Sequence, residues 1–167
     1  WGLPGLAEQG GGLGDSMTPG QWLDSLVDDR IAFRVKFSGT VPTPPQRYWR
    51  GPVLWDFDGK QWSRRNWDSL PAPPGSLNAA ESGLSIPYTV SLEPTERRYL
   101  PVLDWPHSAQ APFFLTAEAS LYSDKPIQKL TEYRAVSWPD LPPITGLNDP
   151  QRRRALALPD GLNPRSV

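Results

Sequence analysis

The sequence contains no cysteine and only one histidine, His107. Disulfides, thiolate metal sites and a cysteine nucleophile are therefore excluded within this chain, as is a metal site built from several histidines. No apolar run approaches the roughly 18 residues that a membrane-spanning helix needs. Charge of one sign is not in excess either, since 17 Lys and Arg face 18 Asp and Glu. That balance argues against a nucleic-acid-binding protein, which usually presents a strongly basic face.

Proline and tryptophan, in contrast, are abundant, with 21 and 8 of the 167 residues. Proline averages about 5% in proteins and costs about 3 kcal/mol inside a helix, so long helices are not expected. Aromatic residues make up 11% of the chain, whereas disordered chains are poor in them. Length and composition together predict one compact β-rich domain whose strands are separated by proline-containing loops.

Alternating apolar residues predict the first strands. Over residues 29–38 every second side chain is large and apolar, which places four of them on one face of a sheet: Ile31, Phe33, Val35 and Phe37. A second strand is predicted over residues 47–57. Asp58 and Gly59 then favour a hairpin turn, because both residue types tolerate positive φ. The return strand is predicted over residues 60–65.

The same alternation predicts a strand over residues 86–93, and further strand candidates follow over residues 97–103, 112–122 and 127–138. Turn residues separate these short segments, a spacing that favours antiparallel pairing over alternating β/α units. The predicted fold class is therefore mainly β, an antiparallel β-sandwich or barrel-like domain with long proline-rich loops and a short C-terminal helix.

The domain organisation follows from shifts in composition. We expect an irregular leader over residues 1–27, the antiparallel β domain over 28–139, and a linker with a short helix over 140–167. Residues 66–85 are rich in Pro, Gly, Ser, Asn and Ala and are predicted to form a long loop or a lid. The C-terminal helix is predicted over residues 151–158, capped by Asp149 or Asn148.

Asp56 and Asp58 are two residues apart, so on a strand their side chains point the same way. Such a pair could serve glycoside hydrolysis, or supply oxygen ligands for Ca²⁺. The alternative is a strand-end Asp followed by a turn Asp, which needs no catalysis. We favour the alternative, and the further ligands of a calcium-binding loop are absent from the sequence.

Aromatic and basic residues surround the predicted hairpin. The spacing of Trp49 and Trp55 favours burial, whereas Trp62 is left open to either a core or a sugar-stacking role. Four arginines flank the hairpin: Arg47, Arg50, Arg64 and Arg65. They could bind a phosphate or carboxylate, but a solvated face paired with nearby acids is the simpler interpretation. The same holds for the run at residues 152–154. The possible interaction surface comprises Arg50, Asp56, Asp58, Trp62, Arg64 and Trp67.

His107 follows Asp104 and precedes Ser108. A catalytic triad is usually assembled from distant segments, so adjacent residues of these types are weak evidence for one. We predict that His107 lies in a loop without a catalytic role. No catalytic, cofactor-binding or metal-ligating residue is therefore predicted in this chain.

A series of segments carries a family resemblance: GLGDSMTPG, DDRIAFRVKFSG, RYWRGPVLWDFDGKQWSRR, YRAVSW and QRRRALALPDGLNPRSV. Together they resemble the TgpA-type, transglutaminase-like inner-membrane proteins of Gram-negative bacteria, over nearly the whole chain. In that family a bundle of transmembrane helices precedes a periplasmic region. This region begins with a non-catalytic β domain and continues into a papain-like transglutaminase core, which a last transmembrane helix follows.

The resemblance implies that this chain is the non-catalytic periplasmic domain ahead of the catalytic core. The family's cysteine nucleophile and its histidine and aspartate all lie downstream, so no catalytic residue is carried over. The implied function is an accessory domain that positions the core near the membrane and contributes to substrate or partner interaction. The implied partners are that downstream domain and envelope proteins or peptidoglycan. The alternative from the residues is a glycan- or peptidoglycan-binding β module that uses exposed tryptophans.

Overall fold

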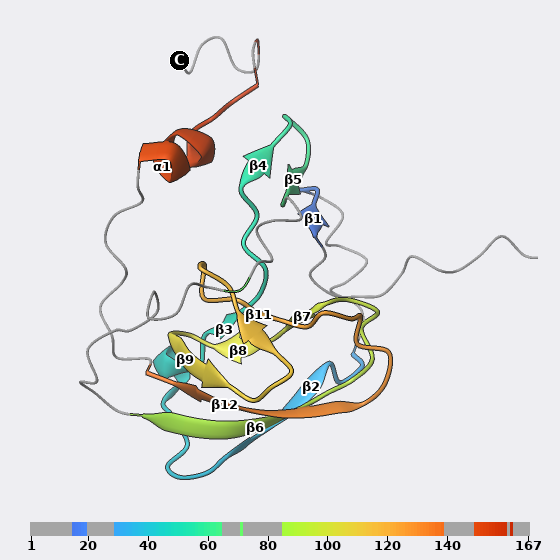
Figure 1. Ribbon diagram of the computed structural model, residues 1–167, viewed down its shortest axis with the longest axis vertical. Coiled ribbons are helices and arrows are strands. Elements are labelled where there is room, and N and C mark those ends of the chain that lie inside the picture. Colours follow the sequence, from blue (N-terminus) through green and yellow to red (C-terminus); the bar gives the residue numbers. More distant parts are fainter. Residues whose placement is uncertain are drawn as a thin grey trace, which may run out of the picture.

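The computed structural model describes residues 15–19, 29–64, 71, 85–138, 149–159 and 161. These residues form a mainly β domain with several antiparallel sheets and one short α-helix (Figure 1), which confirms the predicted fold class. No helix within the described ranges combines the length and the hydropathy needed to cross a membrane. The predicted leader, the 66–85 loop and the 140–167 segment lie largely outside the described residues.

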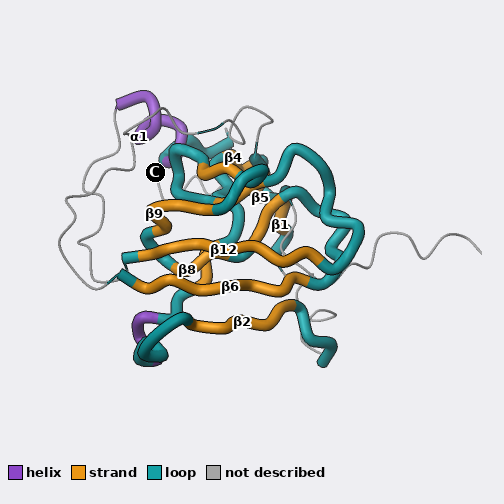
Figure 2. Tube along the Cα trace, turned by 60° about the horizontal axis from the view of Figure 1, so that its bottom comes forward, coloured by secondary structure: helices purple, strands orange, loops and turns teal. Residues whose placement is uncertain are grey.

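A four-stranded antiparallel sheet forms the floor of the domain. Its strands lie in the order β2, β6, β12, β9, with the bounds Phe33–Phe37, Ile86–Leu92, Thr131–Ser137 and Pro106–Ala109 (Figure 2). Alternate residues of β6 and β12 face the core, as the period of a strand requires. Their buried side chains include Tyr88, Val90 and Tyr133, each at most 1% exposed.

Shorter strands cover the inner face of that sheet (Figure 1). They are β3 with β8, and the order β10, β11, β7, with the bounds Trp49–Arg50, Val102–Leu103, Phe114–Leu115, Leu121–Tyr122 and Tyr99–Leu100. Leu100, Val102, Leu103 and Leu121 are buried against β6 and β12. Burying one such aliphatic side chain stabilises a fold by about 1.5–3 kcal/mol. The core therefore lies between these two layers.

Another three-stranded sheet lies at the opposite end of the molecule from the four-stranded sheet (Figure 1). It has the order β1, β5, β4, with the bounds Ser16–Met17, Trp62–Ser63 and Asp56–Phe57. The turn between β4 and β5 contains Gly59 at φ 101°, so the predicted hairpin is confirmed. The helix α1, Asp149–Ala155, lies beside this hairpin, and a 3₁₀ turn, η2, spans Pro44–Gln46.

Proline interrupts two of the predicted strands. The segment 47–57 divides into β3 and β4, and Pro52 lies between them. The segment 97–103 divides into β7 and β8 at Pro101. Proline has no N–H for a ladder and is disfavoured inside a central strand, so each segment pairs with different neighbours on its two sides.

Other differences concern strand ends and an unpredicted strand. Ile31 was predicted to share the buried face of the first strand, but it precedes β2 and is 55% exposed. The predicted strand 112–122 divides into β10 and β11 around a tight turn, in which Ala119 has φ 58°. Ser16–Met17, within the predicted irregular leader, forms β1 on β5. The helix begins at Asp149 and ends at Ala155, three residues before the predicted end.

His107 was predicted to lie in a loop, and this was wrong. It lies on β9, which pairs with β12 at the edge of the four-stranded sheet. Its ring stacks on Trp138 with the centroids 4.0 Å apart. The sequence pattern did not predict this short strand, because the turn residues Asp104 and Trp105 come directly before it.

Candidate functional site

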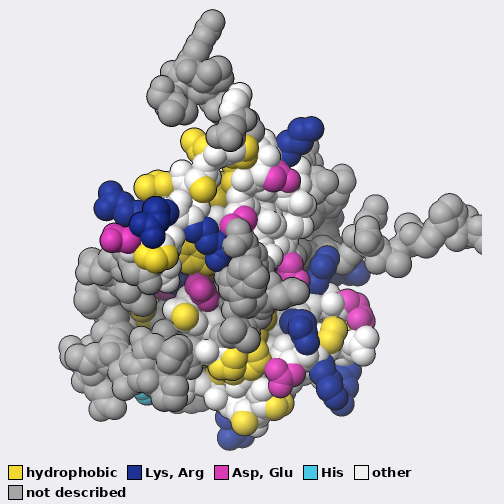
Figure 3. All heavy atoms as spheres, turned by 45° about the horizontal axis from the view of Figure 1, so that its top comes forward, with side chains coloured by type: hydrophobic (Ala, Val, Ile, Leu, Met, Phe, Trp, Pro, Cys, Tyr) yellow, Lys and Arg dark blue, Asp and Glu magenta, His cyan; other side chains and the backbone are white. Residues whose placement is uncertain are grey.

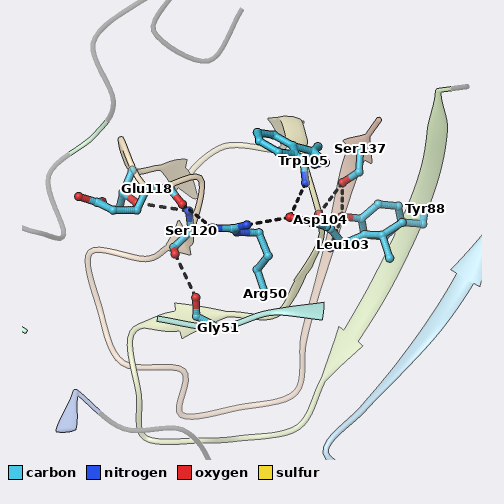
Figure 4. A network of polar contacts seen from close by, with 10 residues as sticks. Arg50, Gly51, Tyr88, Leu103, Asp104, Trp105, Glu118, Ser120 and Ser137 are labelled. Atoms are coloured by element: carbon cyan, nitrogen blue, oxygen red, sulfur yellow. Dashed lines mark hydrogen bonds and ion pairs between the residues drawn. The ribbon is translucent and has the colours of Figure 1, made fainter. Parts of the chain in front are cut away.

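Arg50 does not lie on a solvated face, because it bridges three parts of the domain (Figure 4). Its Nη1 donates to Asp104 Oδ1 at 2.7 Å, and its Nη2 donates to the carbonyl oxygen of Glu118 at 3.0 Å. The Asp104 carboxylate also accepts from the Trp105 backbone N–H at 3.0 Å. Trp105, at φ 54°, holds an unfavourable left-handed conformation. Arg50 therefore fastens β3 to two tight turns and has a structural role.

The polar groups next to Arg50 are also structural (Figure 4). Tyr88 Oη accepts from the Leu103 backbone N–H at 2.8 Å and lies 3.0 Å from Ser137 Oγ. Ser137 Oγ donates in turn to the Leu103 carbonyl oxygen at 2.9 Å. Burial raises the pKa of Tyr88 to about 12, so its hydroxyl stays neutral at physiological pH. These side chains join the two layers and offer no titrating group for catalysis.

Asp56 is held by an arginine from the far end of the sequence. Arg154 Nε donates to Asp56 Oδ1 at 2.9 Å, and Arg154 Nη2 donates to Asp56 Oδ2 at 2.5 Å. The two side chains are 22% and 24% exposed, and the guanidinium carbon lies 5.7 Å from the centroid of the Trp55 ring. Such a two-pronged, partly buried pair is among the stronger ion pairs in proteins.

The Asp58 side chain accepts hydrogen bonds within the turn in which it lies. Its Oδ1 accepts from the backbone N–H groups of Gln61 at 2.7 Å and Lys60 at 2.8 Å. These hydrogen bonds, that from Gln61 first, lower the pKa of Asp58 below its ordinary value. The interpretation of Asp58 as a turn residue is therefore confirmed. Asp56 and Asp58 each have specific partners, so they do not form an open carboxylate pair, and no metal-binding acidic group occurs among the described residues.

Trp62 and Arg64 are both part of the packing of the hairpin. The ring of Trp62 stacks on Phe57 with centroids 4.9 Å apart, and both residues are half-buried. The side chain of Arg64 is 4% exposed, and its guanidinium carbon lies 4.2 Å above the ring of Tyr122. The prediction of a solvated arginine face is therefore wrong for Arg64, as it is for Arg50. Trp67 lies outside the described residues.

The predicted interaction surface therefore falls into two places. Asp56, Asp58, Trp62 and Arg64 lie on or next to the β4–β5 hairpin, whereas Arg50 belongs to the body of the domain. On the side of the molecule that carries α1 and the hairpin, apolar and Lys or Arg side chains lie next to each other (Figure 3). We call β1, residues 55–63 and residues 149–159 the hairpin–helix end, and it is the candidate functional site.

Sequence reasoning missed the two partners that decide these roles. Asp104 is 54 residues from Arg50, and Arg154 is 98 residues from Asp56. Arg154 was predicted to be part of a solvated helix face, which holds for Arg152 and Arg153 but is wrong for Arg154. Nothing in a single sequence signals such distant pairs, because both depend on how the sheets are arranged.

The chain is similar to known proteins over almost all of its length. It is 31% identical over 168 residues to the protein-glutamine gamma-glutamyltransferase of Pseudomonas aeruginosa, covering 99% of this chain and 25% of that protein. The crystal structure of the periplasmic domain of TgpA from Pseudomonas aeruginosa matches with a TM-score of 0.81 and 29% identity. That match covers 93% of this chain and 53% of the crystallised chain.

A crystal structure of the same periplasmic domain bound to ethylmercury matches with a TM-score of 0.77 and 30% identity, covering 93% of this chain and 54% of the other. The chain thus spans about a quarter of the length of the transferase and about half of the solved periplasmic domain. The predicted resemblance and periplasmic localisation are confirmed. Since the sequence profile of the TgpA N-terminal domain matches residues 1–143, the chain belongs to the TgpA N-terminal domain family.

Proposed function

We propose that this chain is the non-catalytic accessory domain of a transglutaminase-like protein, and that it positions the catalytic core near the membrane. One observation carries the proposal: the chain matches the N-terminal domain family and only a quarter of a transferase that acts on protein glutamine. Acyl transfer of this kind in papain-like enzymes runs through a thioester on a cysteine. This chain has no cysteine, so it cannot supply that nucleophile.

The described side chains agree with a structural role. The carboxylates and guanidinium groups that the sequence offered for chemistry have partners within the domain: Asp56 with Arg154, Asp58 with its own turn, and Arg50 with Asp104. A carboxylate or guanidinium that uses its oxygens or N–H groups on a partner within the domain has fewer of them to offer a substrate. An accessory role needs no free reactive group.

The alternative of a glycan-binding module needs an exposed aromatic face. Among the described residues, Trp49, Trp55, Trp62 and Trp105 are half-buried and Trp138 is buried. None of these tryptophans is an exposed side chain. Tyr48 is 64% exposed, but a single exposed ring is not the tryptophan platform that this alternative requires.

The first test compares this chain with a longer protein that includes its own downstream sequence. We expect glutamine-dependent incorporation of an amine into protein only with the longer protein, and we expect a cysteine-alkylating reagent to abolish it. Turnover by this chain alone, insensitive to that reagent, would contradict the proposal.

A second test examines positioning. Residues 1–143 of the full-length protein are replaced by a flexible linker, and the protein is reconstituted in vesicles. We expect amine incorporation into a small soluble glutamine peptide to persist, and incorporation into membrane-attached acceptor proteins to fall. Equal retention of both activities would show that the domain positions nothing.

A further inference from the structure

The helix α1 lies beyond the residues that define the family, yet it is fastened to the domain. The family profile ends at residue 143, and α1 spans Asp149–Ala155. Two hydrogen bonds from Arg154 to Asp56, at 2.9 and 2.5 Å, tie the helix to β4. A planar guanidinium bound through two nitrogens fixes direction as well as distance. The segment that leaves the domain is therefore held in one orientation.

The surface that receives the helix is a packed aromatic unit. Phe57 stacks on Trp62 across the hairpin, and β5 pairs in turn with β1. Trp55 lies under the Arg154 guanidinium, an arrangement in which the ring face attracts the cation. The Arg154 side chain of the helix thus lies over the ring of Trp55, next to the stacked pair of the hairpin.

The residues that follow α1 present two leucines to solvent. The backbone N–H of Leu156 donates to Arg152 O at 3.1 Å, and that of Ala157 donates to Arg154 O at 3.2 Å, so Leu156 lies in a hydrogen-bonded turn and Leu158 follows directly after it. Leu156 is 68% exposed and Leu158 is 60% exposed. Burying such apolar side chains at a contact removes apolar area from water, and exposed apolar patches often mark contact surfaces.

We infer that the hairpin–helix end is the docking surface for the catalytic domain that follows this chain, with Asp56 and Arg154 as positioning residues and Leu156 and Leu158 as the apolar contacts. This inference rests on the proposed function. The occupant follows from chain length, since the solved periplasmic domain is about twice as long as the part that this chain covers. Because the chain matches the N-terminal domain family, we take that remainder to follow α1, and the two leucines then lie on the segment that leads toward it.

The first experiment tests, in this chain alone, whether the Asp56–Arg154 pair holds α1 against the hairpin. Because the chain has no cysteine, spin labels attach only where cysteines are introduced, here by Lys60→Cys on the hairpin turn and Arg153→Cys on α1. We expect one narrow distance distribution by pulsed electron paramagnetic resonance. Asp56→Asn and Arg154→Gln should each broaden it, and the double variant should broaden it no further, because the pair acts as a unit.

Arg152→Ala is the matched control, since Arg152 is an exposed arginine of the same helix. It should leave the distance distribution narrow. The midpoint of unfolding is measured for every variant, so that a loss of folding is not mistaken for release of the helix. A distance distribution that stays narrow in folded Asp56→Asn and Arg154→Gln would show that this pair does not hold the helix.

The second experiment tests the docking surface. Hydroxyl-radical footprinting measures side-chain exposure in this chain and in the full-length protein. We expect oxidation of Leu156 and Leu158 to fall about tenfold in the full-length protein. Leu130, which is also 60% exposed but lies on the body of the domain, is the matched control and should react equally in both.

Two results would overturn the docking surface. One is equal oxidation of Leu156 and Leu158 in both proteins. The other is concentration-dependent protection in this chain alone, which would assign the leucines to contact between two copies. If activity on membrane-attached acceptors still depends on this domain, either result removes only the docking surface. If that activity does not depend on the domain, the proposed function is contradicted as well, and this holds for either outcome of the footprinting.

Discussion

The body of the domain and its hairpin–helix end are held together by different means. In the body, long strands bury side chains completely, and Val90, Val102 and Tyr133 are 0% exposed. In the hairpin–helix end, the strands are two residues long, and the aromatic residues Trp55, Phe57 and Trp62 are all half-buried. The body therefore depends on burial of apolar area, whereas the hairpin–helix end depends on a few directed contacts.

This difference has consequences for stability and motion. Fully buried apolar side chains each contribute on the order of 1.5–3 kcal/mol, and they unfold together. Partly exposed ion pairs and short strands contribute less and open locally at lower cost. We therefore expect the body to set the global stability, and the hairpin–helix end to change its arrangement without unfolding the domain.

The largest effect should come from the body. Tyr133→Ala removes a ring that packs against Phe113 at 5.6 Å between centroids and whose hydroxyl donates to the Pro101 carbonyl oxygen. Replacing a buried aromatic residue by Ala costs about 3–5 kcal/mol. We expect the urea midpoint to fall accordingly, or the domain to fail to fold.

Trp62→Ala in the hairpin is the comparison for Tyr133→Ala. Its ring is larger but half-buried, so its removal should lower the free energy of unfolding by less than half as much. An equal loss for the two variants would mean that the domain does not divide into a body and a dependent end.

The next effect concerns alkaline pH. Burial raises the pKa of Tyr88 to about 12, against about 10 when it is unfolded. A raised pKa contributes stability that is complete below pH 10 and is lost as the pH rises through 12. Two pKa units correspond to roughly 2–3 kcal/mol. We expect the free energy of unfolding to fall by about this amount between pH 10 and 12.

Tyr88→Phe separates this contribution from other alkaline effects. The variant cannot ionise at this position, so the fall in stability over that pH range should be smaller. Tyr133 remains in the variant, and burial raises its pKa too, so part of the fall should persist. An identical pH profile for Tyr88→Phe and the unmodified chain would contradict the assignment.

The sequence predicted the body better than the hairpin–helix end. The alternation at residues 86–93 closely matched β6, because a strand with one buried face repeats every two residues, and the candidate 127–138 contained β12 but began four residues too early. The hairpin at Asp58 and Gly59 was also predicted, since a tight turn requires particular residues. Both features are local, so their signals lie in adjacent residues.

The candidate site was less accessible to prediction. Six residues were proposed as an interaction surface, and five lie in the described part of the chain, but Arg50 and Arg64 are structural. The role of Asp56 depends on Arg154, which is 98 residues away. Contacts at that separation depend on sheet order and loop paths. Composition and periodicity do not specify these.

A medium effect should come from the contacts that join β3 to the two tight turns. Arg50→Ala removes two hydrogen bonds and leaves the Asp104 carboxylate, which is 27% exposed, without its arginine. A charge-assisted hydrogen bond contributes about 1.5–3 kcal/mol, and partial exposure places this pair at the lower end. We expect a loss of about 1–2 kcal/mol in chemical denaturation.

A double-mutant cycle tests whether Arg50 acts through Asp104. Asp104→Ala should cost a similar amount, and the double variant should cost less than the sum of the two single changes. Arg47→Ala provides the control, because Arg47 is exposed and contacts only its own loop through the Pro42 carbonyl oxygen at 2.6 Å. Additive losses for Arg50 and Asp104 would contradict a direct pair.

The smallest effect should be at the tip of the hairpin. Asp58 is exposed, and hydrogen bonds from Gln61 and Lys60 lower its pKa below 3.8. A depressed pKa contributes stability that is present above the unfolded pKa and is lost as the pH falls through the folded one. Amide proton shifts of Gln61 and Lys60 should therefore titrate together below pH 3.8, while the indole signals of the body stay unchanged.

Asp58→Asn should abolish the titration without moving the global midpoint of unfolding. If acid shifts at the tip were accompanied by changes throughout the body, the hairpin would be part of the same cooperative unit, and the contrast between the two regions would be lost.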